Sequence, residues 1–210
     1  MITIEYWSDF VCPFCYIGFA RLKKAVAALS LEDQVEFAMR SFELDRYAPV
    51  TVSDTATEHF ARKYRQPLEK AQVQVEKISQ MGRAEGLVDM DYANTRSTNT
   101  LDAHRLAKYA KQEEDRDIQE LLYHAFFCEH LNIGEKSILL SLAERAGLSA
   151  KKAAKVLSSN AYEEEVWRNE RQAKLLDIHK IPHFVFAGKK RLSGAGSAEE
   201  MTEALKDVME

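Results

Sequence analysis

The sequence predicts an α/β fold in which a small mixed sheet, with helices on both faces, is interrupted by a large all-helical insertion. Three observations lead to this prediction. Residues 2–40 read as strand, helix and strand, residues 53–176 show helical patterns throughout, and strand signals return only after residue 177. Because neither end of the chain carries enough strands for a complete sheet, strands from both ends are expected to share one.

The N-terminal part is predicted to form a βαβ unit. Residues 2–7 are rich in β-branched and aromatic side chains, and apolar residues alternate along 35–40. Between them, apolar residues recur at helical spacing, which predicts a helix over residues 13–29. Pro13 falls at its first position, where the missing N–H of proline costs nothing. Such a unit normally gives two parallel strands with a right-handed crossover.

Capping signals punctuate the central block and predict separate helices within it. Thr55 with Glu58 forms a capping-box pattern, and Asn160 with Glu163 resembles one. Gly147 follows an apolar stripe and is placed as the glycine just beyond a helix end.

The C-terminal part is predicted to complete the sheet. Residues 183–187 and 190–193 read as two strands joined by a Gly-Lys turn, and Ser197 with Glu200 opens a final helix. We therefore expect two domains, a discontinuous one formed by residues 1–52 and 177–210, and a helical insertion formed by residues 53–176.

Composition narrows the functional classes. The 210 residues are 46% hydrophobic and 30% charged, as in an ordinary globular protein, and the formal net charge is −4. The lack of a basic surplus argues against a nucleic-acid partner. No segment is long and apolar enough to cross a membrane. Met1 leads directly into a strand with an early acidic residue, without the basic start of a signal peptide, so we expect a cytoplasmic protein.

The pair Cys12 and Cys15 carries the strongest chemical signal. It lies where the first strand ends and the first helix begins, and the helix dipole at that position would stabilise a thiolate on Cys12. Cys15 follows one helical turn deeper, on the same face. Cys12 can therefore attack a substrate disulfide, and Cys15 can resolve the mixed disulfide that results.

Two other interpretations of the pair remain open, a half zinc site and inert thiols. A zinc site needs two further ligands, and the chain has no second Cys-x-x-Cys. Cys128 and His130 form only an isolated pair on a predicted helix, so no metal site is predicted. Cys128 follows two phenylalanines and is expected to be a buried structural thiol.

Pro182 is the second feature that concerns the site. A proline directly before a strand can simply start that strand. In thioredoxin-like folds, a cis-proline at this place faces the redox pair, and only proline adopts a cis bond cheaply. A cis bond after Ile181 would leave the Ile181 backbone free to pair with an extended substrate.

Five segments together resemble the DsbA family of thiol–disulfide oxidoreductases, in its FrnE-like branch. They are WSDFVCPFC at 7–15, NTLDAHRL at 99–106, NIG at 132–134, IPHFVF at 181–186 and SGA at 193–195. They span nearly the whole chain in the right order.

The resemblance implies a thioredoxin-like fold with a helical insertion and disulfide exchange at the cysteine pair. It implies that Cys12 is the attacking thiol, Cys15 the resolving thiol and Pro182 the cis-proline. The chain departs from the family pattern at Gly196, where a glutamine is common, and at His183, where a small or aromatic residue is common. Both departures concern the substrate groove.

Further candidates for substrate binding surround these residues. Pro13 and Phe14 lie between the cysteines, and Phe14 is expected to be exposed. Ile181 and His183 flank the proline. Trp7 and His104 are included as groove-lining candidates, although Trp7 can equally end a strand in the core. For His104 we favour the other interpretation, a helical histidine bonded within the insertion.

Three functions fit these observations. The leading one is an enzyme that exchanges disulfides with protein or small thiol substrates, without a bound cofactor and with glutathione as a possible redox partner. Another is a glutathione-binding enzyme like the kappa-class transferases or 2-hydroxychromene-2-carboxylate isomerases, which usually carry serine in place of the first cysteine. A third is a chaperone-like binding module with vestigial thiols. The direction of the redox chemistry, the substrate and the oligomeric state do not follow from the sequence.

Overall fold

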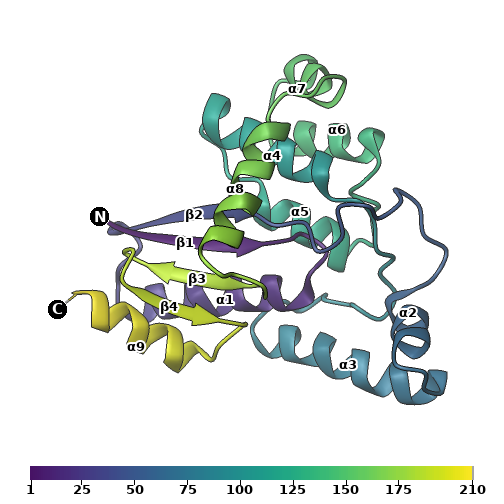
Figure 1. The fold of residues 1–210 in the computed structure, drawn as a ribbon, viewed down its shortest axis with the longest axis horizontal. Coiled ribbons are helices and arrows are strands. Elements are labelled where there is room, and N and C mark those ends of the chain that lie inside the picture. The colour runs from purple at the N-terminus through teal and green to yellow at the C-terminus, as the bar shows by residue number, and fades with distance from the viewer. Residues whose placement is uncertain (210) are drawn as a thin grey trace.

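The computed structural model describes residues 1–209, and their strands form a single four-stranded sheet in the order β2-β1-β3-β4 (Figure 1). The strands are β1 (Ile2–Ser8), β2 (Val35–Ser41), β3 (His183–Phe186) and β4 (Lys190–Ser193). β1 and β2 are parallel, whereas β3 is antiparallel to both β1 and β4. The sheet therefore combines strands from the two ends of the chain, as predicted.

One face of the sheet packs against α1 (Pro13–Ala28) and α9 (Ala198–Met209). Alternation along β1 sends Ile4 and Tyr6 to this face, where they meet Phe184 of β3 and apolar side chains of both helices. Tyr6 lies opposite Phe184 in the strand register, and their rings stack with centroids 5.8 Å apart. This apolar layer holds α1, the helix that begins at the cysteine pair and is called the redox helix below, against the sheet.

The opposite face is covered by α8 (Glu163–Leu175), the last helix before β3. Trp7 of β1 and Val185 of β3 pack there with Ala173 of α8, and the Trp7 indole N–H donates to the Asn169 carbonyl at 3.0 Å. Helices therefore cover both faces of the sheet, but the second face is covered by α8, which lies within the predicted insertion, and not by a helix of the two end segments.

The remaining helices of the insertion lie between β2 and α8 in the sequence. They are α2 (Ala56–Lys63), α3 (Leu68–Ala84), α4 (Leu101–Glu114), α5 (Gln119–Phe127), α6 (Lys136–Arg145) and α7 (Ala150–Leu157). Fully buried leucines of α4, α5 and α6 form the centre of their core. Across residues 1–209, none of the helices combines the length and apolarity needed to span a bilayer.

Most of the predicted caps are present. Thr55 and Glu58 form a complete capping box at α2, and Gly147 adopts a left-handed φ of 71° just beyond α6. The predicted cap at Asn160 is wrong. Helix α8 begins at Glu163 itself, with Tyr162 as N-cap, so Glu163 cannot serve as the third helical residue of a capping box.

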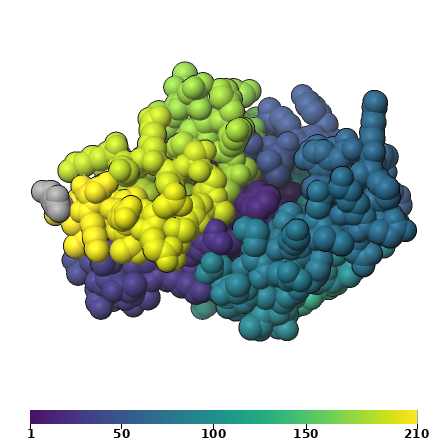
Figure 2. All heavy atoms as spheres, turned by 90° about the horizontal axis from the view of Figure 1, so that it is seen from below, coloured from purple at the N-terminus to yellow at the C-terminus, as the bar shows by residue number. Residues whose placement is uncertain are grey.

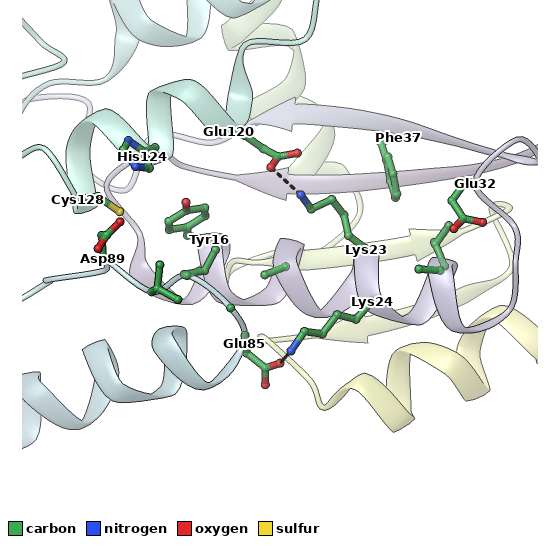
Figure 3. A pocket seen from close by; sticks show the side chains of 16 residues that line it. Tyr16, Lys23, Lys24, Glu32, Phe37, Glu85, Asp89, Glu120, His124 and Cys128 are labelled. Atoms are coloured by element: carbon green, nitrogen blue, oxygen red, sulfur yellow. Dashed lines mark hydrogen bonds and ion pairs between the residues drawn. The ribbon is translucent and has the colours of Figure 1, made fainter.

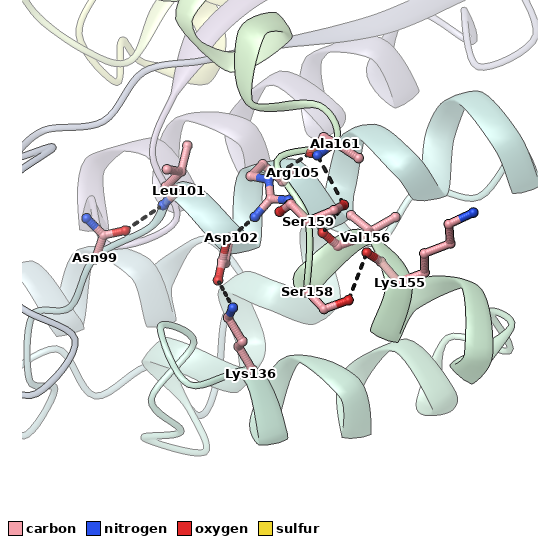
Figure 4. Close-up of polar contacts among 10 residues, drawn as sticks. All are labelled: Asn99, Leu101, Asp102, Arg105, Lys136, Lys155, Val156, Ser158, Ser159 and Ala161. Carbon is pink, nitrogen blue, oxygen red and sulfur yellow. Dashed lines mark hydrogen bonds and ion pairs between the residues drawn. The ribbon is translucent and has the colours of Figure 1, made fainter.

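Arg105 ties α4 to the turn that leads from α7 into α8 (Figure 4). Its guanidinium donates to the carbonyls of Val156 at 2.6 Å and Ala161 at 2.7 Å, also reaches the Ser159 carbonyl, and pairs with Asp102. The carbonyls at the end of a helix lack intrahelical donors, and the Arg105 guanidinium donates the missing hydrogen bonds. The start of α8 is thereby fixed relative to α4.

Asn169 joins α8 to β2 and α4. Its side-chain oxygen accepts the Ser41 backbone N–H at 3.0 Å and the Lys108 ammonium at 2.6 Å. Burial, with a smaller contribution from Arg40, lowers the pKa of Lys108 to about 8. The carboxamide therefore satisfies two donors that the packing of α8 against the sheet removes from water.

We expect Asn169→Ala to lower the free energy of unfolding by about 2 kcal/mol, because it leaves the buried Ser41 N–H without its acceptor and removes the shorter of the two hydrogen bonds of Lys108. Denaturant unfolding measures the change. Asn160→Ala, which removes an exposed carboxamide before the same helix, should change stability by less than about 0.5 kcal/mol. Equal losses in the two variants would contradict the role given to Asn169.

Candidate active site

The cysteine pair lies at the N-terminus of α1, directly after β1. Cys12 is the N-cap residue with extended backbone, Pro13 occupies the first turn, and the Cys15 N–H donates to the Cys12 carbonyl at 3.0 Å. Cys12 and Cys15 approach to 3.3 Å, and within the described chain neither forms a disulfide. The helix geometry therefore holds the two thiols within reach of each other.

The two thiols differ in their surroundings. Cys12 is 5% exposed and Cys15 only 1% exposed. Burial raises the pKa of the Cys15 thiol well above its usual value, and the adjacent Cys12 raises it further. Cys15 therefore holds its proton at neutral pH, which suits a thiol that acts second.

An aromatic wall from α5 encloses the pair. Tyr16, which follows Cys15, stacks on Tyr123 with ring centroids 5.0 Å apart and on Phe127 at 5.7 Å. The Tyr123 and Ser8 hydroxyls are hydrogen bonded at 2.5 Å. The insertion thus contributes one side of the site, and its buried aromatic rings keep water from the resolving thiol.

Pro182 packs against the first turns of α1. The Ile181–Pro182 bond is cis, and the Pro182 carbonyl accepts the Gly194 N–H at 2.8 Å. A Cβ built on Gly18 would lie 3.1 Å from the Pro182 ring, so glycine permits this close approach of the helix. The proline segment and the redox helix are therefore in direct contact.

Phe14 and His183 differ in exposure. Phe14, between the cysteines, is 39% exposed, as expected. His183 is half-buried beside the Trp7 ring, and its Nε2 has no hydrogen-bond partner within residues 1–209. Burial, together with the nearby Arg191, lowers the pKa of His183, so its ring is neutral at pH 7.

Trp7 and His104 were included as substrate-contacting candidates, and the structure contradicts both assignments. They are 0% and 1% exposed. Trp7 faces α8 because alternation along β1 turns it away from the redox helix. His104 is not bonded within the insertion either, since its Nε2 lies 3.3 Å from Asp9 Oδ1, in the loop between β1 and α1.

Asp9 is a residue at the site that sequence reasoning missed. Its backbone carbonyl accepts the Cys12 N–H at 3.1 Å, and its Oδ2 accepts the Leu44 N–H at 2.8 Å. With His104 on Oδ1, the carboxylate of this 1%-exposed residue holds the Cys12 loop to two other segments. The available signal in the sequence was an acidic residue three positions before Cys12.

Cys128 lies in a groove of about 700 Å³ between α1, α5 and the segment 85–89 (Figure 3). It is half-buried, which corrects the expected fully buried thiol, because α5 ends at Phe127 and Cys128 is its C-cap. Burial raises the pKa of Cys128 to about 11. Ion pairs between Lys23 and Glu120 and between Lys24 and Glu85 border this groove.

A separate hollow is visible where atoms from the first part of the chain lie between the C-terminal elements and the helices of residues 56–84 (Figure 2).

The fold and the buried dithiol together define a thioredoxin-fold protein with a Cys-x-x-Cys site and a helical insertion. A model of the DSBA-like thioredoxin domain matches residues 3–206. The chain therefore belongs to the DsbA-like family of thiol–disulfide oxidoreductases, as the motifs predicted, while its assignment to the FrnE-like branch stays a prediction.

Solved structures agree with this assignment. A probable DsbA oxidoreductase from Streptomyces coelicolor, SCO1869, is 34% identical with a TM-score of 0.93, covering 100% of this chain and 90% of that one. A 2-hydroxychromene-2-carboxylate isomerase is 17% identical with a TM-score of 0.73, covering 99% and 96%. The cytosolic disulfide reductase DsbM from Pseudomonas aeruginosa, solved with GSH, is 16% identical with a TM-score of 0.62, covering 99% and 98%. The last two show the fold alone.

We expect iodoacetamide to leave Cys15 unmodified in the reduced, folded protein at neutral pH, because its thiol is buried and its pKa is raised. Mass spectrometry of proteolytic fragments measures the modification of each cysteine. As a control, the same treatment in denaturant should modify Cys12, Cys15 and Cys128 alike. Equal modification of Cys12 and Cys15 in the folded protein would contradict the different roles given to the two thiols.

Proposed function

We propose that this protein exchanges disulfides with thiol or disulfide substrates through the Cys12–Cys15 pair. The observation that carries the proposal is the two thiols 3.3 Å apart at a helix N-terminus, one at the N-cap and the other fully buried. Cys12 attacks a substrate disulfide and releases one substrate sulfur as a thiolate. Cys15 then attacks the mixed disulfide, closes the Cys12–Cys15 disulfide and releases the second substrate thiol.

The substrate is proposed to lie against Phe14 and the Ile181–Pro182 segment. Phe14 offers an exposed aromatic ring beside Cys12, while Pro13 is buried and shapes the first turn. Ile181 is partly exposed and precedes β3, where an extended substrate could pair with its backbone. His183 adds a neutral ring at the edge of this surface.

Glutathione is proposed as a small redox partner, without a bound cofactor. The description of DsbM as a cytosolic reductase solved with GSH supports this choice by analogy of fold. A cytoplasmic location is proposed on the same ground. The alternative function is a glutathione-dependent conjugation or isomerisation, as the fold shared with the isomerase suggests. That chemistry does not need Cys15, whereas disulfide exchange does, so the loss of Cys15 distinguishes the two functions.

We expect Cys12→Ser to abolish disulfide exchange with oxidised glutathione, because no nucleophile remains to form the mixed disulfide. Cys15→Ser should instead accumulate a glutathione adduct on Cys12, which mass spectrometry detects as a stable mass increase. Cys128→Ser is the matched control and should keep the wild-type rate, since Cys128 lies in the separate groove. Full exchange activity in Cys12→Ser would overturn the mechanism, and conjugation that survives the loss of Cys15 would favour the alternative.

The reduction potential of the pair decides the direction of exchange. Equilibration in glutathione buffers, with a thiol-alkylation readout, measures it. A value of about −120 mV would identify an oxidant, and one of about −270 mV a reductant. Only the thiolate of Cys15 can attack the mixed disulfide, and burial keeps this thiol protonated at neutral pH. We therefore expect the Cys12–Cys15 disulfide to close faster as the pH rises. A pair that forms no disulfide at any glutathione ratio would refute the proposed function and favour a binding module with vestigial thiols.

A further inference from the structure

Glu43, two residues beyond β2, is a buried acid without a hydrogen-bonded partner. Its side chain is 1% exposed, and within residues 1–209 neither carboxyl oxygen accepts or donates a hydrogen bond. The nearest cationic atom is Arg46 Nε at 3.9 Å, and Arg46 also pairs with Glu170 at 3.3 Å. A buried carboxylate that lacks hydrogen bonds is costly, so this environment favours the protonated carboxyl.

Like charges around Glu43 act in the same direction as its burial. Glu170 of α8 accepts the Glu43 backbone N–H at 3.0 Å, and Asp9 faces Glu43 from the loop after β1. Burial, together with Glu170 and Asp9, raises the pKa of Glu43 to about 8 against the opposing charge of Arg46. Glu43 is therefore neutral below about pH 8 and negatively charged above it.

Two hydrogen bonds connect the residue after Glu43 to the redox pair by way of Asp9. The next residue, Leu44, donates its N–H to Asp9 Oδ2 at 2.8 Å, and the Asp9 carbonyl accepts the Cys12 N–H at 3.1 Å. On its other oxygen, Asp9 meets His104 of α4 at 3.3 Å. The carboxylate of Asp9 thus stands between Glu43 and the cysteine loop.

A cavity connects Glu43 to the surface. It has a volume of about 400 Å³, and its lining includes Glu43, Glu170 and Trp167 together with Arg171 and Lys174. Its wall also contains Arg46, whose side chain is 39% exposed, and Tyr47, which is 89% exposed. A proton can therefore exchange between water and Glu43 without the opening of the core.

We propose that Glu43 is a positioning residue for the redox pair, a buried carboxyl that takes and releases a proton through this cavity and so sets the charge behind Asp9 and the Cys12 loop. The inference rests on the proposed function of Cys12 as the attacking thiol. Ionised Glu43 adds a second negative charge beside Asp9, and a nearby like charge disfavours a thiolate. Loss of the Glu43 proton therefore restrains Cys12 at alkaline pH.

The rate of Cys12 alkylation by iodoacetamide, followed by mass spectrometry on reduced protein across neutral and alkaline pH, tests the proposal. In the wild type, we expect the rise of the rate with pH to be held back about threefold around pH 8, where Glu43 ionises. The ionisation of Glu43 should appear as a second inflection in the plot of alkylation rate against pH. Glu43→Gln keeps the shape of the side chain but stays neutral, so this inflection should vanish. Glu170→Gln, the matched variant, removes a like charge and should move the inflection to lower pH.

Superimposable profiles of the wild type and Glu43→Gln would overturn the proposal. Should Glu43→Gln fail to fold, Glu170→Gln decides, because an inflection that does not move with the loss of that charge is not the titration of Glu43. The alkylation profile needs no substrate disulfide. A profile that depends on Glu43 in a protein that forms no Cys12–Cys15 disulfide would therefore refute the proposed function alone.

Discussion

The antiparallel pairing of β1 with β3 is the constraint on which the rest of the structure depends. It sets Trp7 opposite His183 and so places the residue after Pro182 beside the end of the strand that leads to Cys12. The same register aligns Tyr6 with Phe184 in the layer that holds α1. Because the two strands come from opposite ends of the chain, the site forms only when the insertion lets those ends meet.

Buried polar contacts, and not apolar packing alone, fix the insertion relative to the sheet. Asn169 satisfies donors from β2 and α4, Arg105 orients the start of α8, and His104 meets Asp9 beside the redox pair. Apolar surfaces pack in several orientations of similar energy, whereas each of these contacts leaves a buried group unsatisfied if the helices shift. Such contacts define one arrangement of the helices around the thiols.

Local sequence signals predicted the elements of the fold but not the partners within the site. Alternation and capping located the strands, α1 and the helix caps at Thr55 and Gly147, because those signals act over a few residues. The bond between His104 and Asp9 joins residues 95 positions apart, and no local pattern specifies it. Trp7 was misassigned because alternation shows that a residue faces away from its neighbours without showing which layer covers it.

Burial has the same consequence for Cys15 and for Glu43. Both side chains lose water, and both then favour the protonated form, since burial disfavours the charged form of a thiol and of a carboxyl alike. Asp9 is buried as well, but the Leu44 N–H and His104 supply its oxygens with hydrogen bonds. The loop before Cys12 therefore carries a hydrogen-bonded acid between two groups that hold protons. A change in either proton alters the field at Cys12 without any movement of the backbone, so the chemistry of Cys12 depends on groups that a substrate never touches.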